Sequence, residues 1–581
     1  MKIMLISLLI SVSSLIYLQL SKTKMPGTAA AKAELLRYKK KFTVSCAVNP
    51  GSFDPTDSAN DIPLLSGWGK YKMEVTTSSD SADIYFQQGI NMYYAFHIIE
   101  ALASFSKSIQ FDSSFAMGYW GMALAYGPNI NDFGYTASPE ALVAKEKAKA
   151  LAGHCTAVER TLIAAMQVRY TADTMQTREI LNQLYVIAMK TAQEQFAANT
   201  DMAVLYADAL MQQHPWDLYN SKGKPKAWTP LIVTTIEKAL ALDPSHPGAA
   251  HYYIHAIEAS DHPEKALAAA DRLPGLMPGV SHVVHMPAHI YIRSGYYKKG
   301  VEVDELAVKG YYDYLRKYPP VASNAPLYLL HNLHMQATCA NMDGRFADAM
   351  KASIDARNSF DSSWLSLPDY MGIFIQYFYM TPWLTQTRFG KWDEMLKEPA
   401  VSPGYVYANL LWHYGRGLAF ARKHNFEQAQ QALNAVQAGL KSGQLKAPAP
   451  SYANPGINGA LVAEKILLGV IAEEQNQFRE ATLQLKAAVS LEDSMIYNEP
   501  RDWVHPARQY LGSVLLKDKK FEEAAEAFKA DLKINPNNGW SLTGLATALA
   551  KQGKKKESQA IAKRAAKAFE RTDMPHPQPV F

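Results

Sequence analysis

Cysteine is scarce in this chain, which has only Cys46, Cys155 and Cys339 among its 581 residues. Three cysteines cannot form a disulfide framework, and no Cys-x-x-Cys pair or Cys/His zinc-finger spacing occurs. An excess of one charge is also lacking, because the net charge is only +5. Proteins that bind nucleic acids usually show a concentrated basic field, so we expect no nucleic-acid partner.

Long apolar runs are missing except at the N-terminus, where Met1-Lys2 precedes an uncharged stretch from Ile3 to Leu20. Residues 1–22 are therefore predicted to be a signal peptide or a membrane anchor, followed by a linker or N-terminal extension over 23–80. We expect an exported protein, periplasmic or secreted, or one attached to a membrane through residues 3–20. The chain also lacks a G-x-S-x-G motif, a Walker-type loop and a dinucleotide fingerprint on a strand–helix unit.

What the chain does contain is an internal repeat of 34 residues. Residues 505–538 form two amphipathic stretches, and residues 82–115 follow the same pattern. The small and aromatic positions recur at equal offsets: Gly512, Ala524 and Phe528 in the later segment, Gly89, Ala101 and Phe105 in the earlier one. Small residues are needed where two helices cross closely, and the aromatic ring fills the gap beside them. Both segments resemble the tetratricopeptide repeat.

This resemblance implies an all-α fold, a right-handed α-solenoid of stacked helix–turn–helix repeats with a concave groove. It further implies that the first helix of each repeat faces the groove and touches ligands. We expect an N-terminal array with insertions over 81–400 and a C-terminal array over 401–581. The insertions fall at residues 214–228, 311–326 and 447–455. Insertions on a solenoid often emerge near the ligand.

Histidine is concentrated in the middle of the chain. The HYYIH stretch begins at His251, and the SHVVHMPAH stretch ends at His289, one repeat of 34 residues after His255. Histidines four residues apart lie on one helical face. By the family resemblance, seven side chains point into the groove: His251, His255, His282, His285, His289, His331 and His334.

Imidazole is the commonest metal ligand in proteins, so this stripe predicts a transition-metal site. Packed helices lie roughly 8–10 Å apart, which lets imidazoles of adjacent helices meet at one ion, but seven ligands on one ion would need strong curvature. We expect a site centred on His285 and His289, with two other pairs as partners or as a second, neighbouring site. These pairs are His251 with His255 and His331 with His334. Imidazole suits zinc, copper, iron or nickel, and the sequence does not choose among them.

Three charged residues on or near the stripe are candidates for catalysis: Glu258, Asp208 and Arg293. The two carboxylates could bind the metal, orient a ligand or act as general base. Metalloprotease chemistry is not predicted, because Tyr252 stands where the H-E-x-x-H motif carries its glutamate. Pro287, between the histidines, either bends a helix or marks a late helix start.

Several interpretations of this pattern stay open. The stretches PWDLY, HYYIHAIEAS and HMPAHIYIR resemble an exported bacterial subgroup of tetratricopeptide proteins, which implies no mechanism. We expect a groove that binds a protein, a peptide or a small molecule beside the metal site. The alternatives are a metal-dependent oxidoreductase or hydrolase, and a pure protein–protein scaffold in which the histidines are ordinary hydrogen-bonded residues. For the aromatic cluster at 497–512, core packing is favoured over ligand contact.

Overall fold

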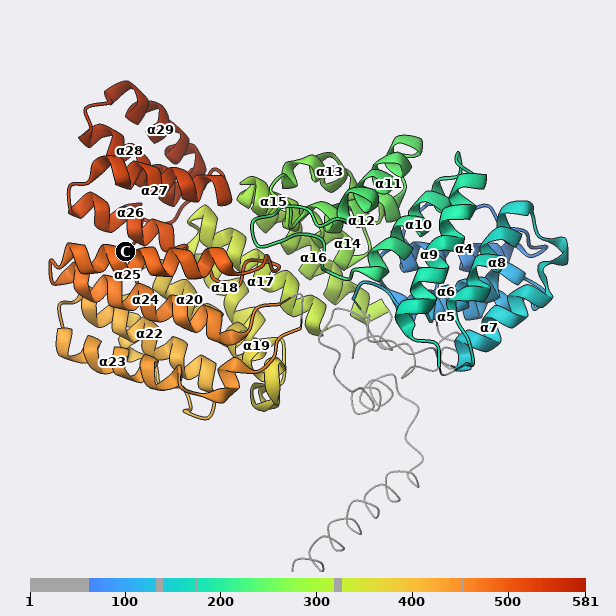
Figure 1. Cartoon of the computed structure of the whole chain (residues 1–581), viewed down its shortest axis with the longest axis horizontal. Coiled ribbons are helices and arrows are strands. Elements are labelled where there is room, and N and C mark those ends of the chain that lie inside the picture. Colours follow the sequence, from blue (N-terminus) through green and yellow to red (C-terminus); the bar gives the residue numbers. More distant parts are fainter. Residues whose placement is uncertain (1–61, 132–138, 174, 318–325, 451–452) are drawn as a thin grey trace, which may run out of the picture.

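In the computed structural model of this chain, the described residues form helices joined by turns and loops, and Tyr219 pairs with Pro225 in an isolated β-bridge (Figure 1). The structure describes residues 62–131, 139–173, 175–317, 326–450 and 453–581. Within these ranges the prediction of an all-α, tetratricopeptide-like solenoid is confirmed. The signal peptide or anchor expected at residues 1–22 lies outside the described residues. Of the helices that are described, none combines the length and the hydropathy that crossing a bilayer requires.

The helices follow one another along the array from blue to red in Figure 1, and each packs chiefly on its neighbours in the chain. The first part contains α4 (Asp80–Tyr94), α5 (Ile98–Phe111), α6 (Ala116–Ala125), α7 (Pro139–Ala150), α8 (Ala157–Arg169), α9 (Arg178–Gln195), α10 (Thr200–Gln213), α11 (Thr229–Leu242), α12 (Pro247–Ile257) and α13 (Leu267–Leu276). The middle contains α14 (Ser281–His285), α15 (Pro287–Ser294), α16 (Tyr297–Lys317), α17 (Pro326–Asp343), α18 (Phe346–Asn358), α19 (Asp369–Tyr379), α20 (Thr381–Arg388) and α21 (Trp392–Lys397). The last part contains α22 (Val406–Arg422), α23 (Phe426–Gly439), α24 (Gly456–Glu474), α25 (Phe478–Ser494), α26 (Ala507–Lys517), α27 (Phe521–Ile534), α28 (Gly539–Lys551) and α29 (Lys555–Ala568).

Glycine and phenylalanine interlock in the two segments that carry the repeat pattern. A Cβ atom on Gly89 of α4 would lie 2.6 Å from the ring of Phe105 on α5, and a Cβ atom on Gly121 of α6 would lie equally close. Gly512 and Phe528 repeat this contact in α26 and α27, where a Cβ atom would lie 2.5 Å from the ring. Any larger residue at these glycines would push the helices apart. The spacing found in the sequence therefore reflects a steric requirement.

Local signals set the ends of the histidine-bearing helices. The ring Nδ1 of His246 accepts the N–H of Ala249 at 3.2 Å, which caps α12. α15 begins at Pro287, whose missing N–H costs least in a first turn, and Met286 before it keeps helical angles (φ −48°, ψ −37°). α15 ends at Gly295 with φ +77°, which a glycine adopts without strain. Because only Met286 separates α14 from α15 and its angles are helical, Pro287 interrupts one helical run between His285 and His289, as the first of the two explanations for Pro287 has it.

Two large apolar cores account for most of the buried surface, one within residues 62–314 and the other within 373–580. The segment before α4 joins the first core through buried Ile62, Trp68 and Met73. The boundary expected at residue 400 stays a prediction. Of the expected insertions, 214–228 and 447–455 both reach the cavity described below, whereas 311–326 begins as a continuation of α16.

Candidate metal centre

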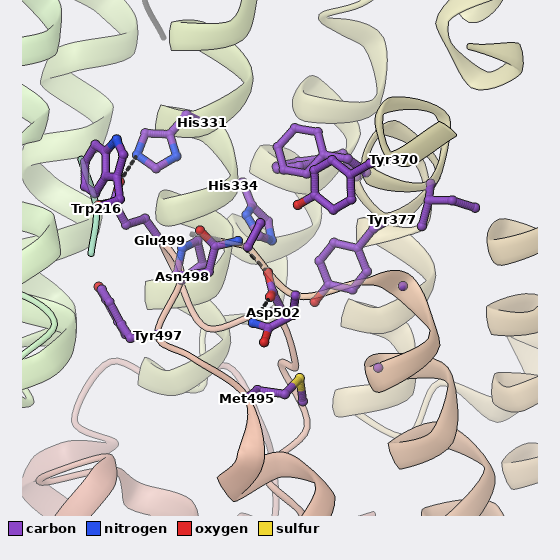
Figure 2. Close-up of a pocket in the computed structure, with 18 of the residues that line it drawn as sticks. Trp216, His331, His334, Tyr370, Tyr377, Met495, Tyr497, Asn498, Glu499 and Asp502 are labelled. Atoms are coloured by element: carbon purple, nitrogen blue, oxygen red, sulfur yellow. Dashed lines mark hydrogen bonds and ion pairs between the residues drawn. The ribbon is translucent and has the colours of Figure 1, made fainter. Parts of the chain in front are cut away.

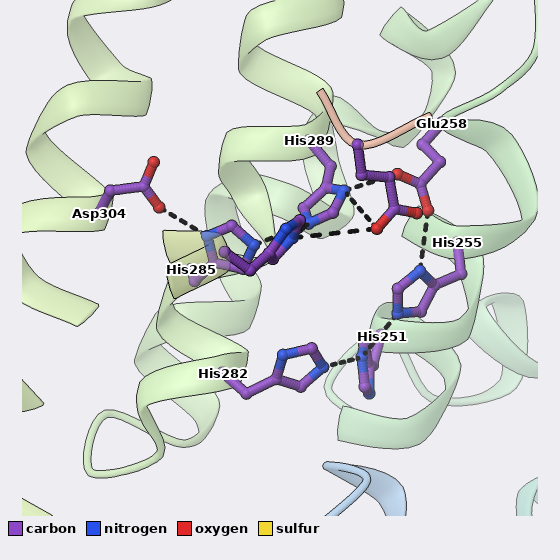
Figure 3. Close-up of polar contacts among 9 residues, drawn as sticks. His251, His255, Glu258, His282, His285, His289 and Asp304 are labelled. Carbon is purple, nitrogen blue, oxygen red and sulfur yellow. Dashed lines mark hydrogen bonds and ion pairs between the residues drawn. The ribbon is translucent and has the colours of Figure 1, made fainter. Parts of the chain in front are cut away.

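Four helices bring the histidine stripe together around Glu258 (Figure 3). α12 carries His251 and His255 and is capped by Glu258, whereas α14, α15 and α17 supply the remaining histidines. All of these side chains except His331 are fully buried, between 0% and 5% exposed, and His331 is partly exposed. Buried imidazoles need partners for their ring nitrogens, so the contacts decide what this cluster can do.

Three imidazoles converge in a first triad, which consists of His251, His255 and His282. Nε2 of His251 lies 3.2 Å from Nε2 of His255 and 3.2 Å from Nε2 of His282. Bonds of about 2.0–2.1 Å to a tetrahedral zinc ion place ligand nitrogens about 3.3 Å apart. The spacing of these nitrogens is therefore that of metal ligands.

A second triad consists of His285, His289 and His331. Nε2 of His289 lies 2.7 Å from Nε2 of His285 and 3.3 Å from Nε2 of His331. Each triad combines an i, i+4 pair from one helical segment with a single histidine from the next. The two triads adjoin, with ring centroids of His255 and His289 6.0 Å apart.

The Nδ1 atoms of several of these imidazoles, on the other side of each ring from Nε2, contact oxygen atoms. Nδ1 of His251 contacts the backbone carbonyl of Tyr94 at 2.6 Å, and Nδ1 of His285 contacts Oδ1 of Asp304 at 2.6 Å. A carbonyl oxygen can only accept, so Nδ1 of His251 donates and its Nε2 carries a lone pair. Partners of this kind fix the tautomer and the ring orientation of metal-binding histidines.

Glu258 holds one imidazole of each triad. Its Oε1 lies 2.8 Å from Nδ1 of His255, and its Oε2 lies 2.6 Å from Nδ1 of His289. Burial would raise the pKa of Glu258, but the adjoining imidazoles of His289 and His255 lower this pKa well below its ordinary value. As a carboxylate, Glu258 accepts from both Nδ1 atoms. Burial lowers the pKa of His255, which favours the neutral ring, and the Nε2 atom of that ring then carries a lone pair.

These assignments place lone pairs against each other. The Nε2 atoms of His251 and His255, 3.2 Å apart, share no proton, which is unfavourable in a buried site unless a cation lies between them. Burial lowers the pKa of His251 and His282 well below the ordinary value, and the adjacent imidazoles lower it further. Neutral imidazole is the form that binds metals. The donor set therefore fits a transition-metal ion.

Two strained aromatic residues flank His255. Phe96 (φ +59°) stacks on its ring with centroids 5.6 Å apart, and Trp216 (φ +58°) meets it edge-on at 5.1 Å. Left-handed backbone in such residues costs of the order of 1–2 kcal/mol each. Strain of this kind clusters at binding and catalytic sites, where the surrounding structure holds it.

Three residues suggested by the sequence lie outside the triads. Both ring nitrogens of His334 are without a hydrogen-bond partner among the described residues, and its ring meets Phe378 at 4.6 Å. Asp208 accepts from the hydroxyl of Tyr93 at 2.6 Å in a separate polar cluster. Arg293 donates to the carbonyl of Ser260 at 2.7 Å.

Two carboxyl groups at the centre were not among the predicted residues. Asp304 lies on the buried face of α16, and Glu499 lies in the loop after α25, with Oε2 3.7 Å from Nδ1 of His289 and 3.9 Å from Nε2 of His331. Burial and the charge of Glu258 raise the pKa of Glu499 well above its ordinary value, so Glu499 carries the proton of its hydrogen bond to Glu258. The 497–512 cluster, for which core packing was favoured, thus supplies a residue to the site.

A cavity of about 180 Å³ opens beside the second triad (Figure 2). Its walls are mainly apolar and come from α17, α19, α22 and α24, together with the loops at 453–455 and 495–502. His255, Glu258, His331 and Glu499 form one end. An engineered cavity of about 150 Å³ accommodates benzene, so this one has room for a small organic molecule.

Comparisons with known proteins agree with the helical architecture. Residues 515–573 match the family described as tetratricopeptide repeat. A comparison with curated proteins finds no match. The chain is similar to a human IFIT1 dimer with PPP-AAAA, with 13% identity over 88% of this chain and 93% of that one and a TM-score of 0.28. It is also similar to yeast Tom70, with 11% identity over 84% of this chain and 92% of that one and a TM-score of 0.27. Likenesses at these scores carry no argument about function. Residues 515–573 thus match a tetratricopeptide repeat, and the rest of the described chain continues the same tetratricopeptide-like array of helix pairs.

Proposed function

We propose that this protein binds a transition-metal ion in each histidine triad and uses its groove to present these ions to a ligand. The observation that carries the proposal is the 3.2 Å distance between the Nε2 atoms of His251 and His255 in a buried site, where both Nδ1 atoms already contact oxygen acceptors. A hydrogen-bonded histidine core would place a proton between them. A cation removes the repulsion instead.

The donor set narrows the choice of metal to zinc, copper or iron, because imidazole suits all three and no thiolate is present in the triads. Three histidines leave at least one coordination position to a ligand from outside the protein. Catalytic zinc sites share this feature, whereas structural sites are closed by four protein ligands. The open position supports the metal-dependent enzyme as the second candidate function.

Charge balance also supports a ligand from outside. Divalent ions in both triads would bring a charge of +4, and the carboxylate of Glu258 is shared between the triads. Buried charges are stable only when they are paired. Anionic ligands at the open positions would supply the missing negative charge.

Metal content after loading tests the proposal. The full chain is incubated with zinc, copper or iron(II), dialysed and analysed by plasma mass spectrometry, and we expect two ions per chain. The double variant His251→Ala/His282→Ala should retain one ion, and so should His285→Ala/His289→Ala. Combining all four substitutions should abolish metal retention while the far-ultraviolet circular dichroism stays nearly unchanged, because the apolar cores do not include these side chains.

The matched control is His262→Ala, since His262 lies in an exposed turn and pairs only with Glu264, at 3.1 Å, among the described residues. This variant should keep both ions. A wild-type chain that retains no metal, or triad variants that retain as much metal as the control, would show that the histidines serve another purpose.

A further inference from the structure

Unpartnered polar atoms are buried in the wall of the cavity beside the second triad. The hydroxyl groups of Tyr377 and Tyr497 and both ring nitrogens of His334 have no hydrogen-bond partner among the described residues. Tyr377 is only 8% exposed and His334 only 3%. Such groups normally find a partner, because leaving them without one costs the free energy of their desolvation. A bound molecule with hydrogen-bonding groups would satisfy them.

The rest of the wall suits an apolar body. Leu327, Leu330, Phe374 and Phe378 face the space from α17 and α19, and Met495 faces it from the loop after α25. Aromatic rings prefer edge-to-face or offset contacts with other rings. Phe374 and Phe378, whose rings meet edge-on at 4.6 Å, both line the cavity, so a ring bound there can make such contacts with them.

The metal end of the cavity lies on the open side of the second triad. The side chains of His331 and Glu499 are 14% and 18% exposed, whereas those of His285 and His289 are 0% and 1% exposed. A molecule in the cavity therefore approaches the triad past His331. An anionic oxygen is favoured there, because three neutral imidazoles leave the charge of an ion uncompensated.

His331, His334 and Tyr377 follow one another along the cavity (Figure 2). His331 and His334 are one turn apart on α17, about 4.5 Å along the helix axis. The ring centroid of Tyr377 lies a further 5.8 Å from that of His334. A molecule beside His334 can therefore contact both His331 of the triad and Tyr377.

Resting on the metal-binding function proposed above, we propose that this cavity binds a small aromatic acid with a second hydrogen-bonding group. Its carboxylate binds the ion of the second triad. Its ring lies between α17 and α19 against Phe374 and Phe378. Its second polar group, a hydroxyl in the simplest case, pairs with Tyr377 and His334.

Titration calorimetry on the zinc-loaded full chain tests this assignment with 4-hydroxyphenylacetate as the probe. Phenylacetate lacks the hydroxyl, and 4-hydroxyphenylethanol lacks the carboxylate. We expect saturable binding of 4-hydroxyphenylacetate, with affinity about tenfold lower for each truncated probe, since a lost polar contact leaves a buried partner unpaired. Removing the zinc should weaken the binding of 4-hydroxyphenylacetate and leave the affinity for 4-hydroxyphenylethanol unchanged.

Tyr377→Phe sharpens the test, because the hydroxyl that it removes has no hydrogen-bond partner among the described residues, so the fold should be unaffected. This variant should bind 4-hydroxyphenylacetate about tenfold more weakly and phenylacetate with unchanged affinity. The matched control is Tyr414→Phe, since the hydroxyl of Tyr414 contacts His505 at 3.2 Å away from the cavity. It should leave the affinities for both probes unchanged.

The outcomes separate this inference from the proposed function. A chain that retains zinc in its triads but shows no saturation with 4-hydroxyphenylacetate below about 5 mM overturns the inference alone. The inference is also overturned if Tyr377→Phe weakens the binding of 4-hydroxyphenylacetate and of phenylacetate equally. A chain that binds no zinc, and binds the acid and the alcohol equally, overturns both.

Discussion

The end repeats and the histidine region are both built from pairs of packed helices. At the equivalent position of the second helix, however, the end repeats bury an aromatic ring and the histidine region buries a carboxyl group. Phe105 and Phe528 are each the eighth residue of the second helix of their pair, and their rings fill the gap beside Gly89 and Gly512. Asp304 is the eighth residue of α16 and binds Nδ1 of His285. The position that closes the packing at the ends thus supports a histidine in the middle.

This difference indicates how a repeat array can hold a polar site without losing its fold. The apolar contacts within the end repeats contribute most of the stability there, and each repeat stabilises its neighbours. The middle can then bury imidazoles and carboxyl groups that would destabilise an isolated helix pair. We therefore expect substitutions in the end repeats to lower mainly the free energy of unfolding, and substitutions in the histidine region to lower mainly metal binding.

The largest effect is expected from Phe528→Ala and Phe105→Ala. Removing a fully buried ring from between two glycine-lined helices should lower the free energy of unfolding by about 3–5 kcal/mol, because little can move into the gap. Urea unfolding followed by circular dichroism measures this loss. Zinc content at low urea should stay at the wild-type level. A loss of zinc in Phe528→Ala would mean that the end repeat and the histidine region do not act independently.

Asp304→Leu should have the opposite effect, because it should lower zinc affinity more than it lowers the stability of the fold. It removes a buried carboxyl group whose pKa is raised well above its ordinary value by burial, and it leaves Nδ1 of His285 without a partner. The free energy of unfolding should therefore fall by about 1–3 kcal/mol, less than in the phenylalanine variants. His285 loses the oxygen that orients it, and zinc affinity at the second triad should drop by about 10–100-fold. Competition with a chromophoric chelator measures this affinity.

The control for Asp304→Leu is Asp531→Leu, which removes a buried carboxylate of α27 that accepts from Gln509 at 2.9 Å. This variant should lose stability and keep its zinc affinity. If both aspartate variants lose stability and neither loses zinc, Asp304 is an ordinary packing residue like its counterparts at the ends.

The sequence predicted the parts of this molecule that depend on spacing alone. Gly89, Phe105, Gly512 and Phe528 recur at equal offsets because one steric contact is repeated, and a contact within one repeat leaves a periodic trace. The histidines could be found as a stripe for the same reason. His334 is the exception, since its ring turns towards Phe378 instead of the triads.

The carboxyl groups of the site could not be predicted in the same way. Glu499 reaches His289 from a loop 210 residues further along the chain, and a single glutamate in a loop has no periodicity. Asp304 occupies a repeat position where the end repeats have a phenylalanine, and spacing alone does not distinguish a functional aspartate from an imperfect copy of the repeat. The division of the histidines into two triads depends on distances between helices, which spacing along one chain does not contain.

The smallest effect is expected from acid, and it compares one buried histidine of the middle with one of the C-terminal part. Burial lowers the pKa of His334 and of His505 to about 3. An unfolded histidine titrates near pH 6.5, so between pH 6.5 and 3 the unfolded chain binds protons that these folded side chains do not. Stability therefore falls as the pH is lowered through this window, by up to about 1.4 kcal/mol per pH unit for each histidine.

In metal-free protein, His334→Gln and His505→Gln should each reduce the slope of the unfolding free energy against pH by up to that amount, measured by urea unfolding between pH 6.5 and 5. His262→Gln, in an exposed turn, is the control and should not change the slope. If only His505→Gln reduces it, the middle of the array is hydrated enough to protonate His334 while folded, and its histidines are less isolated from solvent than those of the C-terminal part.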